Sequence, residues 1–200
     1  GTFTTPTGMR NSQNAYWWAG GAFEVTALDP VKFYADVIYG AGNQSDRKKD
    51  MRSGWFIDAG VEYTGWDILT PQVFGWWSTG EDHSNRNGSE RMPSILSNWG
   101  PGNSFLFDST QDLLKQGNMG VNPIGAYGIG ASLNNISFIE KLSQRLTFVY
   151  LRGNNNPAAI RGLNVAMGSN PYFTMGRDLT TDEFAMGVNF DTTYQIYENL

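Results

Sequence analysis

The chain has no cysteine in its 200 residues, which excludes disulfide scaffolds, thiolate metal sites and cysteine nucleophiles. Charged residues are scarce at 16%, and a soluble surface usually carries more of them. The formal net charge of -5 argues against a nucleic-acid partner. Nor does any apolar run approach the roughly 18 residues of a membrane-spanning helix. Histidine occurs once, as His83 in the polar stretch "GEDHSNRNG", so we expect no serine–histidine chemistry and no enzyme.

Aromatic residues and glycine are abundant instead, with 14% aromatics and 24 glycines. The chain begins "GTFTTPTG", which has neither the basic region nor the apolar core of a signal peptide. It is therefore a mature form, a fragment or a cytosolic chain. The absence of cysteine suits export through an oxidising compartment, although many cytosolic proteins also lack it.

Apolar and polar residues alternate along most of the chain, which is typical of β-strands. In residues 55–63, for example, Trp55, Ile57 and Tyr63 share one face, and Asp58 and Glu62 lie on the other. The alternation predicts strands at 14–27, 31–42, 55–64, 69–79, 124–133, 145–153 and 183–196. Short turns follow the first, third, fifth and seventh strands, the fifth by way of the connector 134–144. Longer polar loops follow the others. This arrangement predicts an all-β fold, a transmembrane antiparallel up-and-down barrel.

The apolar face has aromatic residues near both ends of the strands. Trp55 and Tyr63 are separated by roughly 26 Å along a strand at about 3.3 Å per residue. Strand tilt lowers this to about 20 Å of depth, close to the apolar band of roughly 25 Å between the aromatic girdles of a barrel. We therefore predict Trp17, Trp55 and Trp77 in the loop-side girdle, and Tyr63 with Tyr194 or Ile196 in the turn-side girdle.

The opposite face carries most of the charge and would line a water-filled passage. The predicted pore-lining residues are Glu24, Lys32, Asp36, Asp58, Glu62, Arg145, Glu183 and Asp191. The excess of acids over bases predicts a mild preference for cations. The alternative is that these charges pair across strands and serve packing, for instance Lys32 with Glu24 or Asp58.

The connection 80–123 is long enough to expect a function. Within it, "DSTQDLLKQG" has helical signals: Asp108 or Ser109 as N-cap, Asp112 in the first turn and Gly117 as the stop. The apolar run 105–107 would be poorly hydrated in a free loop. We expect the loop either to fold into the lumen as a constriction, with Asp108 and Asp112 near its narrowest point, or to pack against a neighbouring subunit.

Several stretches together resemble one known family, the outer-membrane homotrimeric porins of sulfate-reducing bacteria. They are "AYWWAGGAFEVT", "DPVKFYADVIYG", "GWFIDAGVEYTGWDILTPQVFGWWSTG" and "ISFIEKLSQRLTFVYLRGNN". The resemblance implies a general-diffusion porin of about sixteen strands, assembled as a trimer in the bacterial outer membrane, with no cofactor. Its partners would be the lipid bilayer, lipopolysaccharide and small hydrophilic solutes. Bacterial barrels have an even strand number. We therefore expect residues 1–200 to be part of a longer barrel chain, from its C-terminal half.

Two other architectures remain open at this stage. A soluble or surface carbohydrate-binding β-sandwich also has alternating strands and would gather its aromatics in one groove with polar partners. A small, non-porin barrel of eight strands would need a lumen packed by side chains. The glycine-rich inner face of residues 124–133 argues against such packing.

Overall fold

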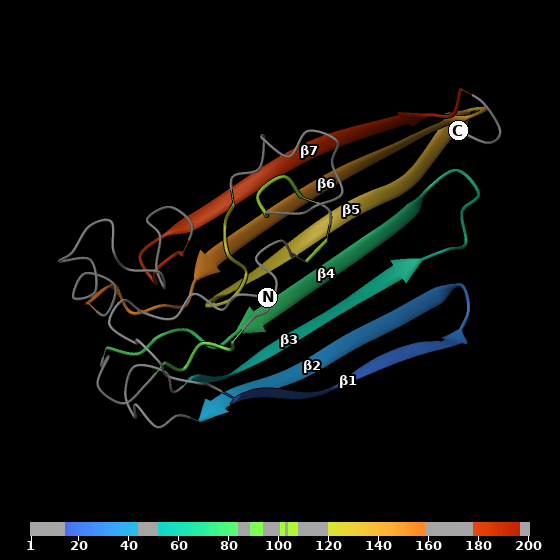
Figure 1. Ribbon diagram of the computed structural model, residues 1–200. Coiled ribbons are helices and arrows are strands. Elements are labelled where there is room, and N and C mark those ends of the chain that lie inside the picture. The colour runs from blue at the N-terminus through green and yellow to red at the C-terminus, as the bar shows by residue number, and fades with distance from the viewer. Residues whose placement is uncertain are drawn as a thin grey trace.

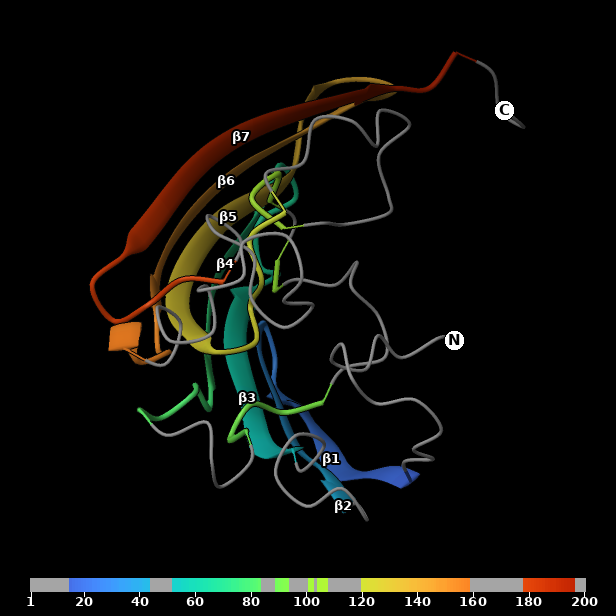
Figure 2. The same ribbon diagram turned by 60° about the vertical axis from the view of Figure 1, so that its left-hand side comes forward.

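The computed structural model describes seven stretches of the chain: 15–43, 52–83, 89–93, 101–102, 104–107, 120–158 and 178–196. They contain one antiparallel sheet of seven strands, in which each strand pairs with its neighbours in chain order (Figure 1). The strands are β1 (Ala15–Leu28), β2 (Val31–Asn43), β3 (Arg52–Tyr63), β4 (Thr70–Ser78), β5 (Ala126–Ile139), β6 (Leu142–Gly153) and β7 (Phe184–Tyr194). The sheet is strongly curved (Figure 2), but it does not close on itself.

The predicted all-β meander is thus confirmed as a single open sheet, with β1 and β7 at its edges. Among the described residues, no helix is long and apolar enough to cross a membrane. The prediction for residues 134–144 was wrong. They extend β5 and β6 on either side of a tight turn at Glu140 and Lys141. The pairing shifts twice between Leu133 and Ile139, and these irregularities broke the two-residue period on which the prediction relied.

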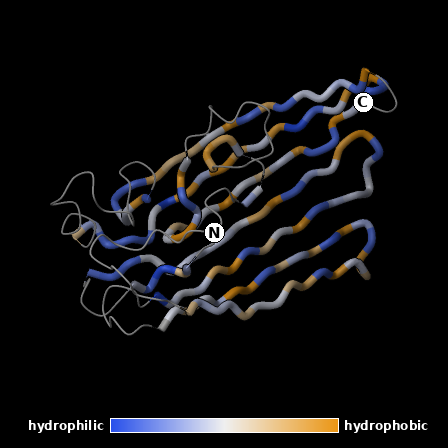
Figure 3. Tube along the Cα trace, in the orientation of Figure 1, coloured by the Kyte–Doolittle hydropathy of each residue, from blue (hydrophilic) through white to orange (hydrophobic). Residues whose placement is uncertain are grey.

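Register is continuous across the sheet, so residues of one kind lie side by side from β1 to β7. Across the middle of the sheet, Phe33 pairs with Val61 and Val61 with Val73. Further along, Val73 pairs with Ala131 and Ala131 with Phe148. Figure 3 shows the same alternation as changes of hydropathy along the strands. Because side chains alternate between faces, this register places the apolar side chains on the convex face and the polar set on the concave face.

The concave face also carries large rings, and several of them lie opposite a glycine. Tyr34 pairs with Gly60, and Trp76 pairs with Gly128. A Cβ atom added at Gly128 would collide with the Trp76 ring and would lie 2.5 Å from the Tyr150 carbonyl oxygen. The glycines of β5 therefore leave room for rings from β4 to lie over them on the concave face.

The apolar core lies on this concave side, between the sheet and parts of the connection that precedes β5. Leu106 and Phe107 are almost completely buried there. The Phe107 ring meets the Trp76 ring edge-on at 5.5 Å. Val121 donates a backbone hydrogen bond of 2.8 Å to the carbonyl of Leu106, which brings residues 120–125 alongside residues 104–107. Each fully buried side chain of this size contributes about 1.5–3 kcal/mol.

Substituting Gly128 with alanine tests the ring-and-glycine packing. We expect Gly128→Ala to lower the free energy of unfolding by about 1–3 kcal/mol, because the carbonyl that its Cβ meets cannot move without disturbing the strand. The matched control is Gly21→Ala on the convex face, where the added Cβ would make an ordinary contact of 3.4 Å with Phe23. The midpoint of urea unfolding should fall for the first variant only, and equal midpoints would contradict this packing.

Candidate functional site

The candidate site is the charged concave wall of the sheet. Register places all the predicted pore-lining residues there except Glu183: Glu24, Lys32, Asp36, Asp58, Glu62, Arg145 and Asp191. Glu183 lies just before β7, and its carboxylate accepts a 2.8 Å hydrogen bond from the backbone N–H of Thr180. That side chain therefore caps a turn at the end of the strand.

Two opposite-charge pairs form across neighbouring strands of this wall. Lys32 Nζ lies 3.4 Å from Glu62 Oε1. Arg145 donates from Nε and Nη2 to one oxygen of Asp191, at 3.0 and 2.8 Å. The alternative of cross-strand pairing is therefore confirmed for these four residues, although Lys32 pairs with Glu62 and not with Glu24 or Asp58. Each pair cancels its own charge in the field of the wall.

The other acids on this wall are Glu24, Asp36 and Asp58, and all three lie on β1–β3. None forms an ion pair within the described part of the chain. Asp36 and Asp58 are direct partners across β2 and β3, an arrangement in which like charges repel. The Oδ1 atom of Asp58 is buried and has no hydrogen-bond partner among the described residues. Such a pair of carboxylates gains stability from a nearby cation.

Neutral polar side chains cross the wall next to these acids, toward the short turns. Gln72 Nε2 donates to the Tyr34 hydroxyl at 2.8 Å, and Asn134 Nδ2 donates to Gln72 Oε1 at 3.2 Å. Ser132 donates to the Thr147 hydroxyl at 3.0 Å. The concave face therefore has an apolar zone toward the long connections and a polar zone toward the turns.

Part of the long connection lies against this wall. Beside the Trp76 contact on β4, Leu106 and Phe105 approach Gly187 on β7, where an added Cβ would lie 2.9 Å from Leu106 Cγ. We call residues 104–107 and 120–125 the wall segment. The apolar run expected to pack on something thus packs on the inner face of its own sheet (Figure 2). Asp108 and Asp112, predicted near a constriction, lie outside the described residues.

The predicted girdle residues all project from the convex face. Tyr39 lies between Trp17 and Trp55, with ring-centroid distances of 5.5 and 4.8 Å. Trp77, one strand further on, is 41% exposed. At the turn end, Tyr63 meets Trp66 edge-on at 5.3 Å. Tyr194 is exposed at the same end of β7. The sequence analysis did not assign Tyr39 and Trp66 to a girdle.

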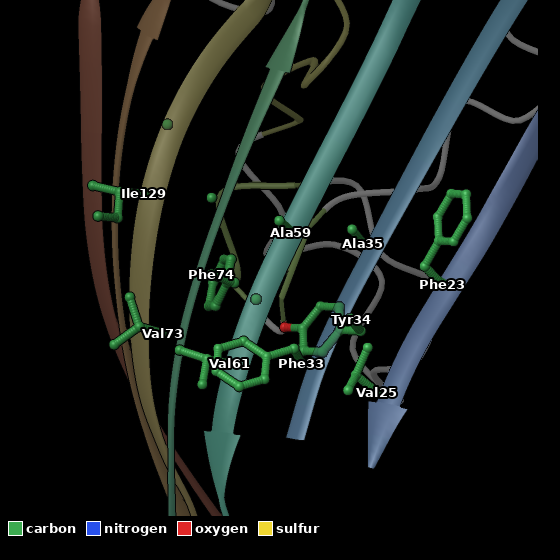
Figure 4. A pocket seen from close by; sticks show the side chains of 13 residues that line it. Phe23, Val25, Phe33, Tyr34, Ala35, Ala59, Val61, Val73, Phe74 and Ile129 are labelled. Atoms are coloured by element: carbon green, nitrogen blue, oxygen red, sulfur yellow. The ribbon is translucent and has the colours of Figure 1, made fainter. Parts of the chain in front are cut away.

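The convex face also contains a shallow apolar groove of about 540 Å³. Three small residues in register on β2–β4, Ala35, Ala59 and Gly75, lower the surface there. Larger side chains such as Phe33 and Val73 stand beside them (Figure 4). The groove is therefore a shallow depression in the apolar convex face, on the opposite side of the sheet from the charged wall.

A buried polar cluster lies where the long connections leave β4–β7, and the sequence analysis missed it. Its residues come from separate segments: Ser78, Glu81, Arg91, Asn122, Asn155 and Asp178. We call it the loop-end cluster. Its members are 74 to 87 residues apart in some contacts, and no local spacing signals such contacts. The one hint is the triple asparagine directly after β6.

Three carboxylates gather at one side of this cluster. Oxygens of Glu81, Asp82 and Glu90 lie within 4.8 Å of one another, the one such acidic group of three among the described residues. Two of these carboxylates accept hydrogen bonds from the protein. Ser89 Oγ donates to Glu81 at 2.6 Å, and the Asp82 N–H donates to Glu90 at 3.2 Å. Burial, with a smaller contribution from Glu90, raises the pKa of Glu81 from 4.5 to about 7.

Comparison with known proteins assigns no relative to this arrangement. No family model, curated protein or solved structure matches the chain. Function therefore has to be argued from the two faces of the sheet.

The raised pKa of Glu81 predicts a pH-dependent stability. Because burial favours the protonated form in the folded state, the folded protein loses stability as pH rises from about 4.5 to about 7. Glu81→Gln removes the charge and keeps an acceptor for Ser89, so its stability should fall less than that of the wild type over this range and exceed it above the range. Thermal unfolding between pH 4 and about 8 measures both proteins. The control Glu140→Gln, in the exposed β5–β6 turn, should keep the wild-type slope.

Proposed function

We propose that this chain forms part of an outer-membrane β-barrel porin, a passive, mildly cation-preferring channel for ions and small hydrophilic solutes. The observation that carries the proposal is the difference between the two faces of one curved sheet. Its convex face is apolar and exposed, and its concave face carries the charged and polar side chains beside the packed apolar zone. Lipid outside and water inside is the environment that such a sheet fits.

The convex face is too apolar to be left in water. Phe23 and Val188, near opposite edges of the sheet, are each 61% exposed, and Ile129 between them is 55% exposed. Soluble monomers rarely expose contiguous apolar patches larger than a few hundred Å². The aromatic contacts at the two strand ends, Tyr39–Trp55 and Tyr63–Trp66, are placed as membrane girdles would be.

Hydrocarbon also imposes a condition on the edges of the sheet. Every backbone N–H and C=O must be paired there, so spanning strands occur only in closed barrels. The outer edges of β1 and β7 therefore need further strands. The resemblance noted above suggests a barrel of about sixteen. Such a barrel leaves an aqueous lumen, which the charged concave wall would line.

Selectivity follows from the charges that remain after pairing. Lys32–Glu62 and Arg145–Asp191 are each neutral overall, and Arg52 lies at the loop end of β3. The net charge of the middle of the wall therefore comes from the acids of β1–β3. Charged side chains in a narrow aqueous passage select ions of the opposite sign. The expected preference is therefore for cations, and no cofactor is needed because the gradient of the solute drives its passage.

The other two candidates fit these observations less well. A carbohydrate-binding sandwich would cover its apolar face with a second sheet and place its aromatics beside polar partners. Here Trp17, Tyr39 and Trp55 stand at strand ends on the apolar face. A small barrel closed by side chains would need bulk on the concave face of β5, where Gly128 and Gly130 lie.

The proposed partners are the lipid bilayer with its lipopolysaccharide and two further copies of the same chain. The trimer comes from the family resemblance. The apolar groove over Ala35, Ala59 and Gly75 is compatible with close packing of a neighbouring chain, and equally with lipid.

Planar-bilayer recording of the full-length protein tests the channel directly. Under a several-fold potassium chloride gradient, we expect large ohmic steps and a reversal potential of cation-selective sign. An anion-selective sign would keep the channel and overturn the role of the acids. No conductance from correctly folded protein would refute the porin proposal.

Neutralising the unpaired acids tests the origin of the selectivity. The double variant Asp36→Asn, Asp58→Asn should bring the reversal potential toward zero, with a several-fold lower cation-to-anion permeability ratio. The matched control, Arg145→Gln with Asp191→Asn, removes one charge of each sign from the same wall and should leave the ratio close to that of the wild type. Equal shifts in both variants would show that position on the wall does not decide selectivity.

A further inference from the structure

The shortest ion pair among the described residues lies outside the charged concave wall, in the loop-end cluster. Arg91 Nη2 donates to Asp178 Oδ1 at 2.6 Å, and the two side chains are only 9% and 4% exposed. The residues are 87 positions apart in sequence. The contact therefore ties the connection after β4 to the connection before β7.

This ion pair also holds the chain that leads into β5. The same Arg91 nitrogen donates to the Ile124 carbonyl at 3.0 Å, and Asn122 Nδ2 donates to Asp178 Oδ1 at 2.9 Å. Asn122 in turn accepts from the Ile124 N–H at 3.0 Å. The ion pair thus contacts residues 120–125 at two points.

Those residues form one half of the wall segment. Next to Asn122, Val121 holds Leu106 through its backbone hydrogen bond, and Phe107 follows on the Trp76 ring. A short series of contacts therefore runs from the ion pair to the side chains that lie on the concave wall. The residues that follow Arg91 and Asp178, Met92 and Leu179, pack in the same core.

Asn155 reinforces the position of the ion pair. Completely buried, it donates from Nδ2 to the carbonyls of Gly125 and Leu179, at 3.0 and 2.7 Å. Its Oδ1 accepts from the Glu81 N–H at 3.1 Å. The residues next to Ile124 and Asp178 are thereby fixed to the end of β6, so the ion pair rests on a frame attached to the sheet.

We propose that Arg91 and Asp178 are positioning residues that hold the wall segment against the barrel wall and so set the open cross-section of the passage. The consequence for the passage rests on the porin function proposed above. The positioning itself does not, because it concerns contacts within the described chain.

Breaking a buried ion pair leaves an uncompensated charge, which the protein relieves by opening to water. The loop-end cluster is where that opening has to occur, since both charges lie between the connections. Released from Arg91, residues 120–125 lose their anchor, and Leu106 and Phe107 keep only their apolar contacts. The wall segment then leaves the wall for part of the time and moves into the lumen, so the open cross-section of the passage fluctuates and is intermittently narrowed.

Arg91→Leu in the full-length protein is the first test. Backbone amides of the wall segment should exchange hydrogen roughly 100-fold faster, since a buried charge is left unpaired, with the strand amides of β2 and β3 unchanged. In planar bilayers the current noise should increase, with brief partial closures that the wild type does not show. Asp178→Asn keeps an acceptor oxygen without its charge and should give the same changes at smaller amplitude. It also serves if Arg91→Leu does not fold.

The matched control is Arg145→Leu, which breaks the other arginine–aspartate pair of the described chain, at 2.8 Å on the exposed wall. Because this pair lies toward the turn end of β6 and β7, in the polar zone of the concave face, hydrogen exchange in the wall segment should remain slow. The variant should move the reversal potential and leave the current noise at its wild-type level.

A cross-link separates positioning from general loss of stability. An added Cβ at Gly187 would lie 2.9 Å from Leu106 Cγ, and the chain has no cysteine of its own. Leu106→Cys with Gly187→Cys should therefore form a disulfide that ties the wall segment to β7. In the Arg91→Leu background, oxidation should restore slow exchange and wild-type conductance, and reduction should reverse both.

Conductance tests the porin function, and hydrogen exchange tests the positioning role of the ion pair, so the two proposals can fail separately. If the wild type conducts no ions, the porin function is refuted, while hydrogen exchange still decides the role of the ion pair. Unchanged exchange in the wall segment of Arg91→Leu and Asp178→Asn would overturn the positioning proposal. Faster exchange that the cross-link does not reverse would overturn it too, because the loss would then not concern attachment to the wall.

Discussion

Backbone pairing between neighbouring strands, in a register that repeats every two residues, decides which environment each side chain meets. A slip of one residue anywhere would turn the apolar set of a strand toward the charged wall. Between β2 and β3 no shift occurs: Val31 opposes Tyr63 at one end and Gly42 opposes Arg52 at the other. The irregular pairings lie next to the turns, between Val25 and Leu28 and between Leu133 and Ile139. The middle of the sheet therefore keeps its exposed apolar side chains on one face and its charged side chains on the other.

The concave face divides its area between packing and charge. Where rings lie opposite glycines, as Trp76 does opposite Gly128, the wall stays smooth enough for a segment from another part of the chain to lie on it. Nearer the turns, the rows around Gln72 and Ser132 are polar and hydrogen-bonded to one another. The same strands thus hold a structural element and an aqueous surface, separated by only a few residues along each strand.

Alternation alone was enough to predict the strands, their order and the face of residues such as Asp36 and Arg145, because a two-residue period is a local property. An ion pair needs a partner from another strand, and the two-residue period of one strand does not identify that partner. The contact of Lys32 with Glu62 was therefore missed. The strand ends at 134–144 were lost because the irregular pairing there breaks the period. The loop-end cluster was beyond sequence reasoning altogether, since contacts such as Arg91–Asp178 join distant segments through tertiary structure.

The wall segment has a consequence for the order of assembly. Leu106 precedes β5 in the chain, yet part of the surface that receives it belongs to β7, the last described strand. The segment cannot reach its final place until β5 and β6 have paired and β7 has brought Gly187 alongside, so docking follows the pairing of these three strands. Contacts that close over such long stretches of chain form slowly. During that interval, Leu106 and Phe107 are exposed, and the growing sheet is therefore most vulnerable to aggregation just before β7 arrives.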